Sequence, residues 1–206
     1  YTSFSSGKGW IMKKIKGYII IVIFILLLNG CGQFKKEEKS VEEMLIAIDK
    51  NECASVHDGE MTLNLGMTLK DFNAYYNEEE IVSESTPTNL ITNDVIEGKY
   101  YKWYFHDYED ISISTTNYCV EENLAEYDYI VYKFTLWTSR FHTSKGVSVG
   151  STLNELEAAY GENLELVETD RYEYKESDVA IRFFMEHNRV EKIEVIAMKY
   201  TSLNAK

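Results

Sequence analysis

The apolar and polar positions in the second half of the chain predict a short strand, a turn and a capped helix. Leu153 and Leu156 begin an apolar face with helical spacing. Thr152 and Glu155 have the spacing of a capping box, in which each side chain accepts a hydrogen bond from a backbone amide at the helix start. Gly161 stands where helices commonly end in a left-handed residue. We therefore expect a short helix that starts after Thr152.

An earlier stretch of the chain repeats this pattern. Six pairs of positions match without a gap at a constant offset of 84 residues. The pairs are Gly66 and Gly150, Thr68 and Thr152, Leu69 and Leu153, Asp71 and Glu155, Phe72 and Leu156, and Tyr76 and Tyr160. The constant offset indicates two copies of one unit. We therefore expect a second helix of the same kind near the start of the first copy.

Alternating or aromatic-rich runs after each helix predict antiparallel strands. These runs cover 99–105, 111–116 and 129–137 in the first copy, and 171–174, 179–185 and 190–196 in the second. Asn188 lies between the last two runs and suits the left-handed position of a hairpin turn. Helices packed on one face of an antiparallel sheet make an α+β domain. The predicted fold class is therefore α+β, with two tandem helix-plus-antiparallel-sheet repeats after an N-terminal signal helix and a flexible tether.

The N-terminal segment has the features of a secretory signal in order. A basic start at Met12–Lys16 precedes an apolar run from Tyr18 to Leu28. That run is shorter than the ~20 residues that a membrane-spanning helix needs. The next residues, Leu-Asn-Gly-Cys31, resemble the lipobox of bacterial lipoproteins. The resemblance implies that Cys31 carries diacylglycerol with acyl chains such as palmitate, and that the chain is anchored on the extracytoplasmic face of the cell membrane. An uncleaved anchor is the alternative.

These patterns divide the chain into four predicted parts. Residues 1–31 comprise upstream residues and the lipoprotein signal, and 32–60 a charged tether with a short helix. The first repeat covers 61–143, and the second covers 144–206. Residues 1–11 precede a Met-Lys-Lys start, so we leave them out of the predicted fold.

The charge of the chain limits its partners. The net charge is -13, and from Cys31 onward it is -17, because four of the 21 basic residues and none of the 34 acidic residues lie before that position. Nucleic acids are bound by Lys and Arg side chains that neutralise phosphates. The acidity therefore argues against a nucleic-acid partner and fits a soluble body or one that binds a basic partner.

The repeated unit also resembles a known family. An apolar-x-apolar-Gly-x-Thr start, a short helix, Tyr-Gly, a Tyr-x-Tyr strand and a terminal hairpin are similar to the repeat of β-lactamase-inhibitory-protein-like domains, and one unit is similar to small SmpA/OmlA-type lipoproteins. The positions that carry the resemblance include Gly66, Thr68, Tyr76, Gly150, Thr152, Tyr160, Gly161, Tyr172 and Tyr174. The first copy departs from it, with Asn77 in place of the glycine and a long insertion over 82–98. The resemblance implies a binding or accessory role without catalysis.

The cysteines leave two alternatives. If Cys31 is lipidated, Cys53 and Cys119 remain. An even number of cysteines outside the cell suggests one disulfide between them. Two buried free thiols are the other possibility. Cys53 also lies close to His57, as a Cys–His nucleophile would require, but neither an orienting acid nor an oxyanion-forming glycine motif stands beside them.

Metal and acid–base chemistry have weaker signals. The four histidines are scattered without zinc-site spacing, and the acidic runs 78–80 and 106–110 lack the pattern of a calcium loop. We therefore predict no metal and no cofactor. A cell-envelope hydrolase that uses Asp107 or Glu109 as acid–base residues is the alternative to a non-catalytic protein.

The aromatic residues are the strongest candidates for a partner-binding surface. The run 100–105 is almost entirely aromatic, and successive strand residues point to opposite sides, so one set can fill the core while the other faces out. We predict that Tyr101, Trp103, Phe105 and Trp137 contribute to a binding face. Packing against the insertion or the second repeat is the alternative. The sequence thus favours a lipid-anchored, non-enzymatic module that binds a protein or a cell-envelope polymer, with a structural spacer as a further possibility.

Overall fold

The computed structural model describes residues 51–59, 61–76, 90–96, 98–118 and 123–201. The chain separates into two compact units, 1–38 and 39–206, and every described residue belongs to the second. The predicted signal segment, the tether with its helix, Cys31, Cys119 and the acidic run 78–80 lie outside the described residues. No described helix is both long and apolar enough to cross a membrane.

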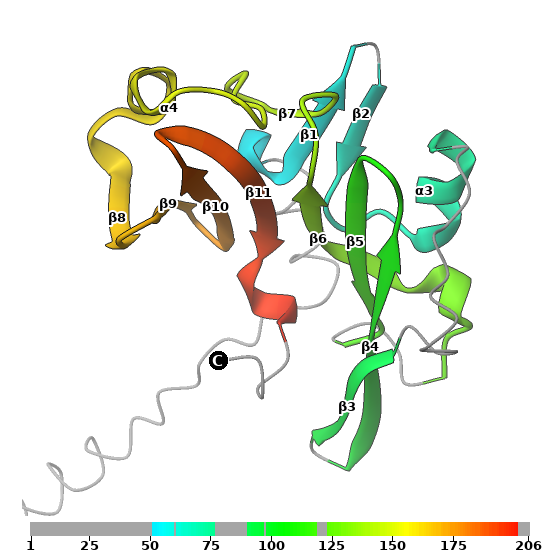
Figure 1. Cartoon of the computed structure of the whole chain (residues 1–206). Helices are drawn as coiled ribbons and strands as arrows, with labels where there is room; N and C mark the ends of the chain where they lie inside the picture. Colours follow the sequence, from blue (N-terminus) through cyan, green and yellow to red (C-terminus); the bar gives the residue numbers. More distant parts are fainter. Residues whose placement is uncertain (1–50, 60, 77–89, 97, 119–122, 202–206) are drawn as a thin grey trace, which may run out of the picture. The chain divides into compact units, whose positions relative to one another are not determined.

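The larger of the two sheets has eight antiparallel strands. Its order is β3-β4-β5-β6-β11-β10-β9-β8, as Figure 1 shows. The strands are β3 (Leu90–Ile96), β4 (Lys99–Asp107), β5 (Ile111–Thr116), β6 (Ile130–Leu136), β8 (Leu164–Glu168), β9 (Arg171–Glu176), β10 (Val179–Glu186) and β11 (Arg189–Ala197). Strand β6 pairs with β11, so the strands on either side of this pair belong to one continuous sheet. The β10–β11 turn has positive φ at His187 and Asn188, as the sequence predicts for Asn188.

The smaller sheet joins parts of the chain that are distant in sequence. It has the order β2-β1-β7, with β1 (Ser55–Asp58), β2 (Met61–Asn64) and β7 (His142–Thr143). A short 3₁₀ turn, η1 (Glu52–Ala54), leads into β1. The β1–β7 pairing sets His57 opposite His142, and it ties the start of the described chain to the segment after β6.

Two short α-helices, α3 (Leu69–Tyr75) and α4 (Leu153–Tyr160), occur in the described part of the chain. Thr68 and Thr152 are their N-caps, and Thr152 forms the predicted capping box with Glu155. Gly161 follows α4 with a φ of 61°. Three further 3₁₀ turns are η2 (Glu126–Asp128), η3 (Gly161–Asn163) and η4 (Met198–Tyr200).

The predicted fold class is wrong. The described chain is mostly antiparallel β-sheet arranged in two sheets, and its α-helices have only seven and eight residues, too little for a helix layer in each of two α+β repeats. The prediction assigned each copy its own sheet. In the structure, β6 and β11 satisfy each other's backbone hydrogen bonds, because an unpaired strand edge leaves amides and carbonyls without partners. The helix-start pattern was recognised correctly, but it does not define the fold class.

The core is built from apolar side chains of the large sheet and from aromatic clusters next to the helices. Phe134, Ile193 and Phe183 are fully buried in the sheet. Near α3, Tyr108 packs against Phe72 and Tyr76 at ring-centroid distances of 5.3 and 5.2 Å. Near α4, Tyr160 packs against Tyr174 and Phe183 at 4.9 and 5.0 Å. Each helix thus contributes one side to an aromatic cluster rather than forming a layer.

Candidate functional site

One side of the large sheet carries a row of polar side chains that crosses six strands. Directly paired residues lie on the same side of a sheet. Successive pairings on β4, β5, β6, β11, β10 and β9 align Asp107, Ser112, Thr135, Glu194, Arg182 and Glu173. Ser112 and Thr135 are nearly inaccessible to solvent. Buried sheet positions are usually apolar, so a polar row with buried members invites a functional explanation.

Trp137 lies directly after β6 at the edge of this row. Its indole Nε1 donates to Ser112 Oγ at 2.5 Å, and Ser112 Oγ donates to Asp107 Oδ1 at 2.5 Å. The Lys192 ammonium lies 5.8 Å from the Trp137 ring centroid and 3.6 Å from that of Phe184. Trp137 is nevertheless 44% exposed. The indole is therefore held in one orientation while much of it stays accessible to a partner. We call Trp137, Phe184 and Lys192, together with the polar row and Lys133, the Trp137 face.

Glu194 is the centre of the charges on this face. Its carboxylate oxygens lie 3.4 Å from Lys192 Nζ, 4.0 Å from Lys133 Nζ and 3.9 Å from Arg182 Nη1. Arg182 Nε also donates to Glu173 at 2.8 Å. Arg182 therefore links the two carboxylates, and three cations share the Glu194 carboxylate.

Burial and neighbouring charges shift the ionisation of these groups. Burial lowers the pKa of Lys133, the Glu194 carboxylate raises it, and the positive charges of Lys192 and Arg182 lower it again, with a net lowering. Burial alone would raise the pKa of Glu173, but hydrogen bonds from Arg182 and Lys175 outweigh it and hold that pKa below its usual value. The lowered pKa keeps the Glu173 carboxylate negatively charged at neutral pH, and Lys133 is surrounded by other cations.

The four aromatic residues predicted to bind a partner have different environments. Trp103 is completely buried, and its indole donates to the Tyr200 carbonyl at 2.8 Å. Tyr101 is 9% exposed and packs against Tyr118. Phe105 is half-buried on β4, and Trp137 is exposed. Trp103 and Tyr101 therefore do not lie on a contact surface as predicted. The segment after β11 covers Trp103, and residues after β5 cover Tyr101.

Cys53 has the environment of an unreactive thiol. Its Sγ donates to Glu176 Oε2 at 3.2 Å, and it is a free, buried cysteine rather than half of a disulfide. Burial is the main reason that the pKa of Cys53 is raised to about 11, and the hydrogen bond and negative charge of Glu176 raise it further. A thiolate is the nucleophilic form of cysteine, so Cys53 is not suited to attack a substrate near neutral pH.

His57 lies in a hydrogen-bonded network that does not include Cys53. Its Nε2 is 3.1 Å from Ser55 Oγ, and its Nδ1 is 3.0 Å from Thr62 Oγ1. Ser55 Oγ also lies 3.0 Å from the Glu52 carbonyl, to which it can donate. The Ser55–His57 pair is thus part of a hydrogen-bonded network that joins η1, β1 and β2.

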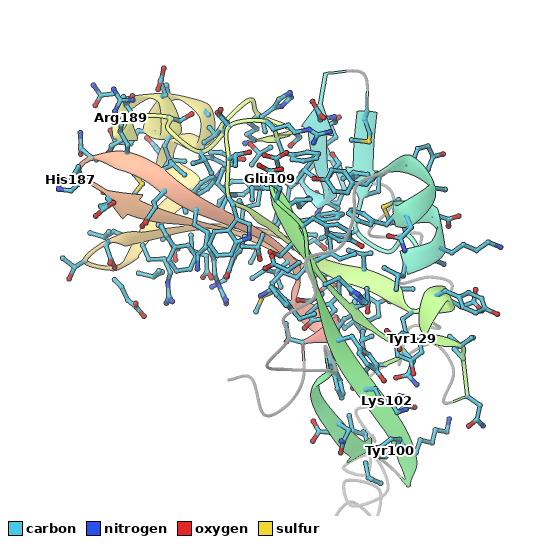
Figure 2. All side chains as sticks on the ribbon, turned by 45° about the vertical axis from the view of Figure 1, so that its right-hand side comes forward. Tyr100, Lys102, Glu109, Tyr129, His187 and Arg189 are labelled. Carbon is cyan, nitrogen blue, oxygen red and sulfur yellow. The ribbon has the colours of Figure 1, made fainter. Side chains whose placement is uncertain are left out.

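The two carboxylates considered for hydrolysis lie at one end of β4. Asp107 accepts a hydrogen bond from Ser112, and Glu109 is exposed in the β4–β5 turn. Figure 2 shows Glu109 at the opposite end of β4 from Tyr100 and Lys102. Within the described ranges, no cluster of three or more His, Cys, Asp or Glu side chains could hold a metal ion. The Asp107 carboxylate thus helps to hold Trp137 in place through Ser112.

Comparisons with known proteins add one distant structural likeness. No protein-family model matches the chain, and no curated protein matches it either. The chain is similar to the crystal structure of the uncharacterized protein yfeY from Escherichia coli, with 13% sequence identity and a TM-score of 0.38, over 67% of this chain and 94% of that chain. A likeness this weak supports no conclusion about fold or function.

Proposed function

We propose that this protein is a lipid-anchored lipoprotein of the bacterial envelope whose Trp137 face binds a protein or cell-envelope partner without catalysing a reaction. The main support is that Trp137 is exposed yet fixed by Ser112 and Lys192. Tryptophan is among the residues that contribute most to binding interfaces, and a side chain that is already ordered loses little conformational entropy on binding. The lipobox ending at Cys31 supports the anchoring.

The surroundings of the chemically reactive residues also support a non-catalytic role. Cys53 stays protonated near neutral pH, and His57 hydrogen-bonds Ser55 and Thr62 instead of Cys53. Asp107 accepts a hydrogen bond from the serine that holds Trp137. These groups are explained by structural roles, so binding accounts for the features of the face with fewer assumptions than hydrolysis does.

Cross-linking in intact host cells tests the binding face. The full chain with Trp137→Ala should lose a cross-linked partner that the natural chain and Tyr127→Ala both retain. Tyr127 is a matched control because it is an exposed aromatic residue on η2, and it is 57% accessible. Partner capture that is insensitive to Trp137→Ala, or equally sensitive to Tyr127→Ala, would contradict the proposal. In the same cells, Cys31→Ser should move the chain out of the lipid-anchored fraction.

A further inference from the structure

The Trp137 face and its border gather cationic side chains within an acidic chain. The net charge of the chain is -13, yet four cationic side chains surround two carboxylates on β6, β9, β10 and β11. The cations are Lys133, Lys175, Arg182 and Lys192, and the carboxylates are Glu173 and Glu194. Asp107 on β4 is a third carboxylate in the same row. At the border of the face, among the described residues, Arg171 pairs with Glu168 at 2.8 Å, and Glu165 lies opposite Glu173 on β8.

Neighbouring positive charges add to burial in lowering the pKa of Lys133 in the unbound protein. Lys133 has only 25% of its side chain exposed and interacts with the positive charges of Lys192 and Arg182. Glu194 is the carboxylate that these three cations share. Charges in a partly buried site are screened less by water and salt than exposed ones. A negative group brought to Lys133 and Lys192 would relieve this repulsion.

The aromatic residues near Lys192 indicate what the ligand needs in addition to a negative group. The Trp137 and Phe184 rings both lie near the Lys192 ammonium, so a ligand that reaches Lys192 also meets apolar surface. Such a ligand needs a negative group next to an apolar one. Acidic protein segments that interleave carboxylate and apolar side chains have this combination.

Resting on the binding role proposed above, we propose that the Trp137 face binds an acidic segment of a partner protein. The carboxylates of this acidic segment lie at Lys133 and Lys192, and the apolar side chains of the segment lie on Trp137 and Phe184. A phosphate-rich polymer fits less well, because every repeat is negative and would meet Glu173 and Glu194 in the same row. The strongly acidic remainder of the chain would also repel a uniform polyanion.

Calorimetric titration of the full chain tests this ligand chemistry. The probes are a short peptide of alternating glutamate and leucine, its counterpart with glutamine in place of glutamate, and inorganic polyphosphate. The glutamate peptide should bind, and its affinity should fall as salt is raised. The glutamine peptide should bind about tenfold more weakly, because it cannot pair with the lysines.

A pair of lysine variants localises the effect. Lys192→Met keeps the length and the apolar contacts of the side chain but removes its charge, and Glu194 keeps Lys133 and Arg182 as partners. This variant should bind the glutamate peptide about fivefold more weakly, and Lys192→Arg should restore binding. Lys70→Met is the control, since Lys70 is an exposed lysine of α3.

Any one of four results would overturn the inference. The first two are no binding of the glutamate peptide and equal binding of the two peptides. The others are unchanged affinity in Lys192→Met and tighter binding of polyphosphate than of the glutamate peptide. If the cross-linked partner still depended on Trp137 in cells, the binding role would stand and only the acidic ligand would be refuted.

Discussion

At the scale of single residues, Cys53 illustrates how surroundings determine chemistry. Burial and the Glu176 carboxylate raise its pKa from 9.0 to about 11. Because the thiolate is the reacting form, alkylation of Cys53 in the folded chain at pH 8 should be about a hundredfold slower than in the denatured chain. Peptide mapping by mass spectrometry after iodoacetamide treatment measures this ratio at Cys53 alone. The rate should rise as the pH approaches 11, and equal rates in the two states would contradict the assignment.

At the scale of elements, both helices depend on their threonine N-caps and on hydrogen bonds to strands of the large sheet. Gly66 N donates to the Val131 carbonyl, and Gly150 N donates to the Val190 carbonyl, each at 2.7 Å. The turn before each helix is therefore attached to a strand of the large sheet. Short isolated helices are marginal in water, so this attachment and the caps are what make seven or eight residues helical.

Removal of one cap should have a measurable cost. Thr152 accepts from the Glu155 amide, and Thr152→Ala leaves that amide without its partner. We expect the free energy of unfolding to fall by about 1 kcal/mol, as measured by urea denaturation. Thr152→Ser keeps the hydroxyl and should recover most of the loss. Asn154→Ala changes an exposed residue inside α4 and should leave stability nearly unchanged. A loss in Asn154→Ala as large as that in Thr152→Ala would argue against the cap.

At the scale of the whole molecule, the β6–β11 pairing makes the large sheet one structural unit. Phe134 on β6 lies opposite Val195 on β11, and both are fully buried. Phe134→Ala should lower the free energy of unfolding by about 3–5 kcal/mol, because it leaves a cavity at this junction. Amide hydrogen exchange should show that β5 and β10 lose protection together. Continued protection of β10 after loss in β5 would show that the strands on the two sides of the junction unfold independently. Tyr127→Ala, at an exposed site, is the control.

Much of the local structure followed from the sequence. The predicted run 111–116 coincides with β5, and 179–185 differs from β10 by one residue, because alternation and flanking turns report directly on strands. The sequence did not reveal β3, which lies inside the predicted insertion 82–98, or β8, whose side chains are mostly exposed. It also did not reveal the small sheet, whose strands have only two to four residues. Such strands lack a clear apolar alternation.

The candidate site was predicted only in part. Trp137 stood out as an aromatic residue beside a long strand, but Ser112, Lys192 and Glu194 carried no signal of their own. They come from strands that are distant in the sequence, and only the order of the sheet brings them together. Trp103 was misplaced because strand alternation separates two faces but cannot tell which one the rest of the chain covers.

The amino-acid sequence by itself determined the helix caps, most long strands and the acidic character of the chain, since each depends on neighbouring residues or on composition. Only the tertiary structure decided that β6 joins β11, which aromatic side chains are buried, and where the few cations gather. The reason is that hydrogen bonding between strands and packing over a sheet connect residues that no local pattern relates. An acidic chain therefore brings Lys133, Arg182 and Lys192 together around one carboxylate beside an exposed tryptophan, an arrangement that its total charge would not have suggested.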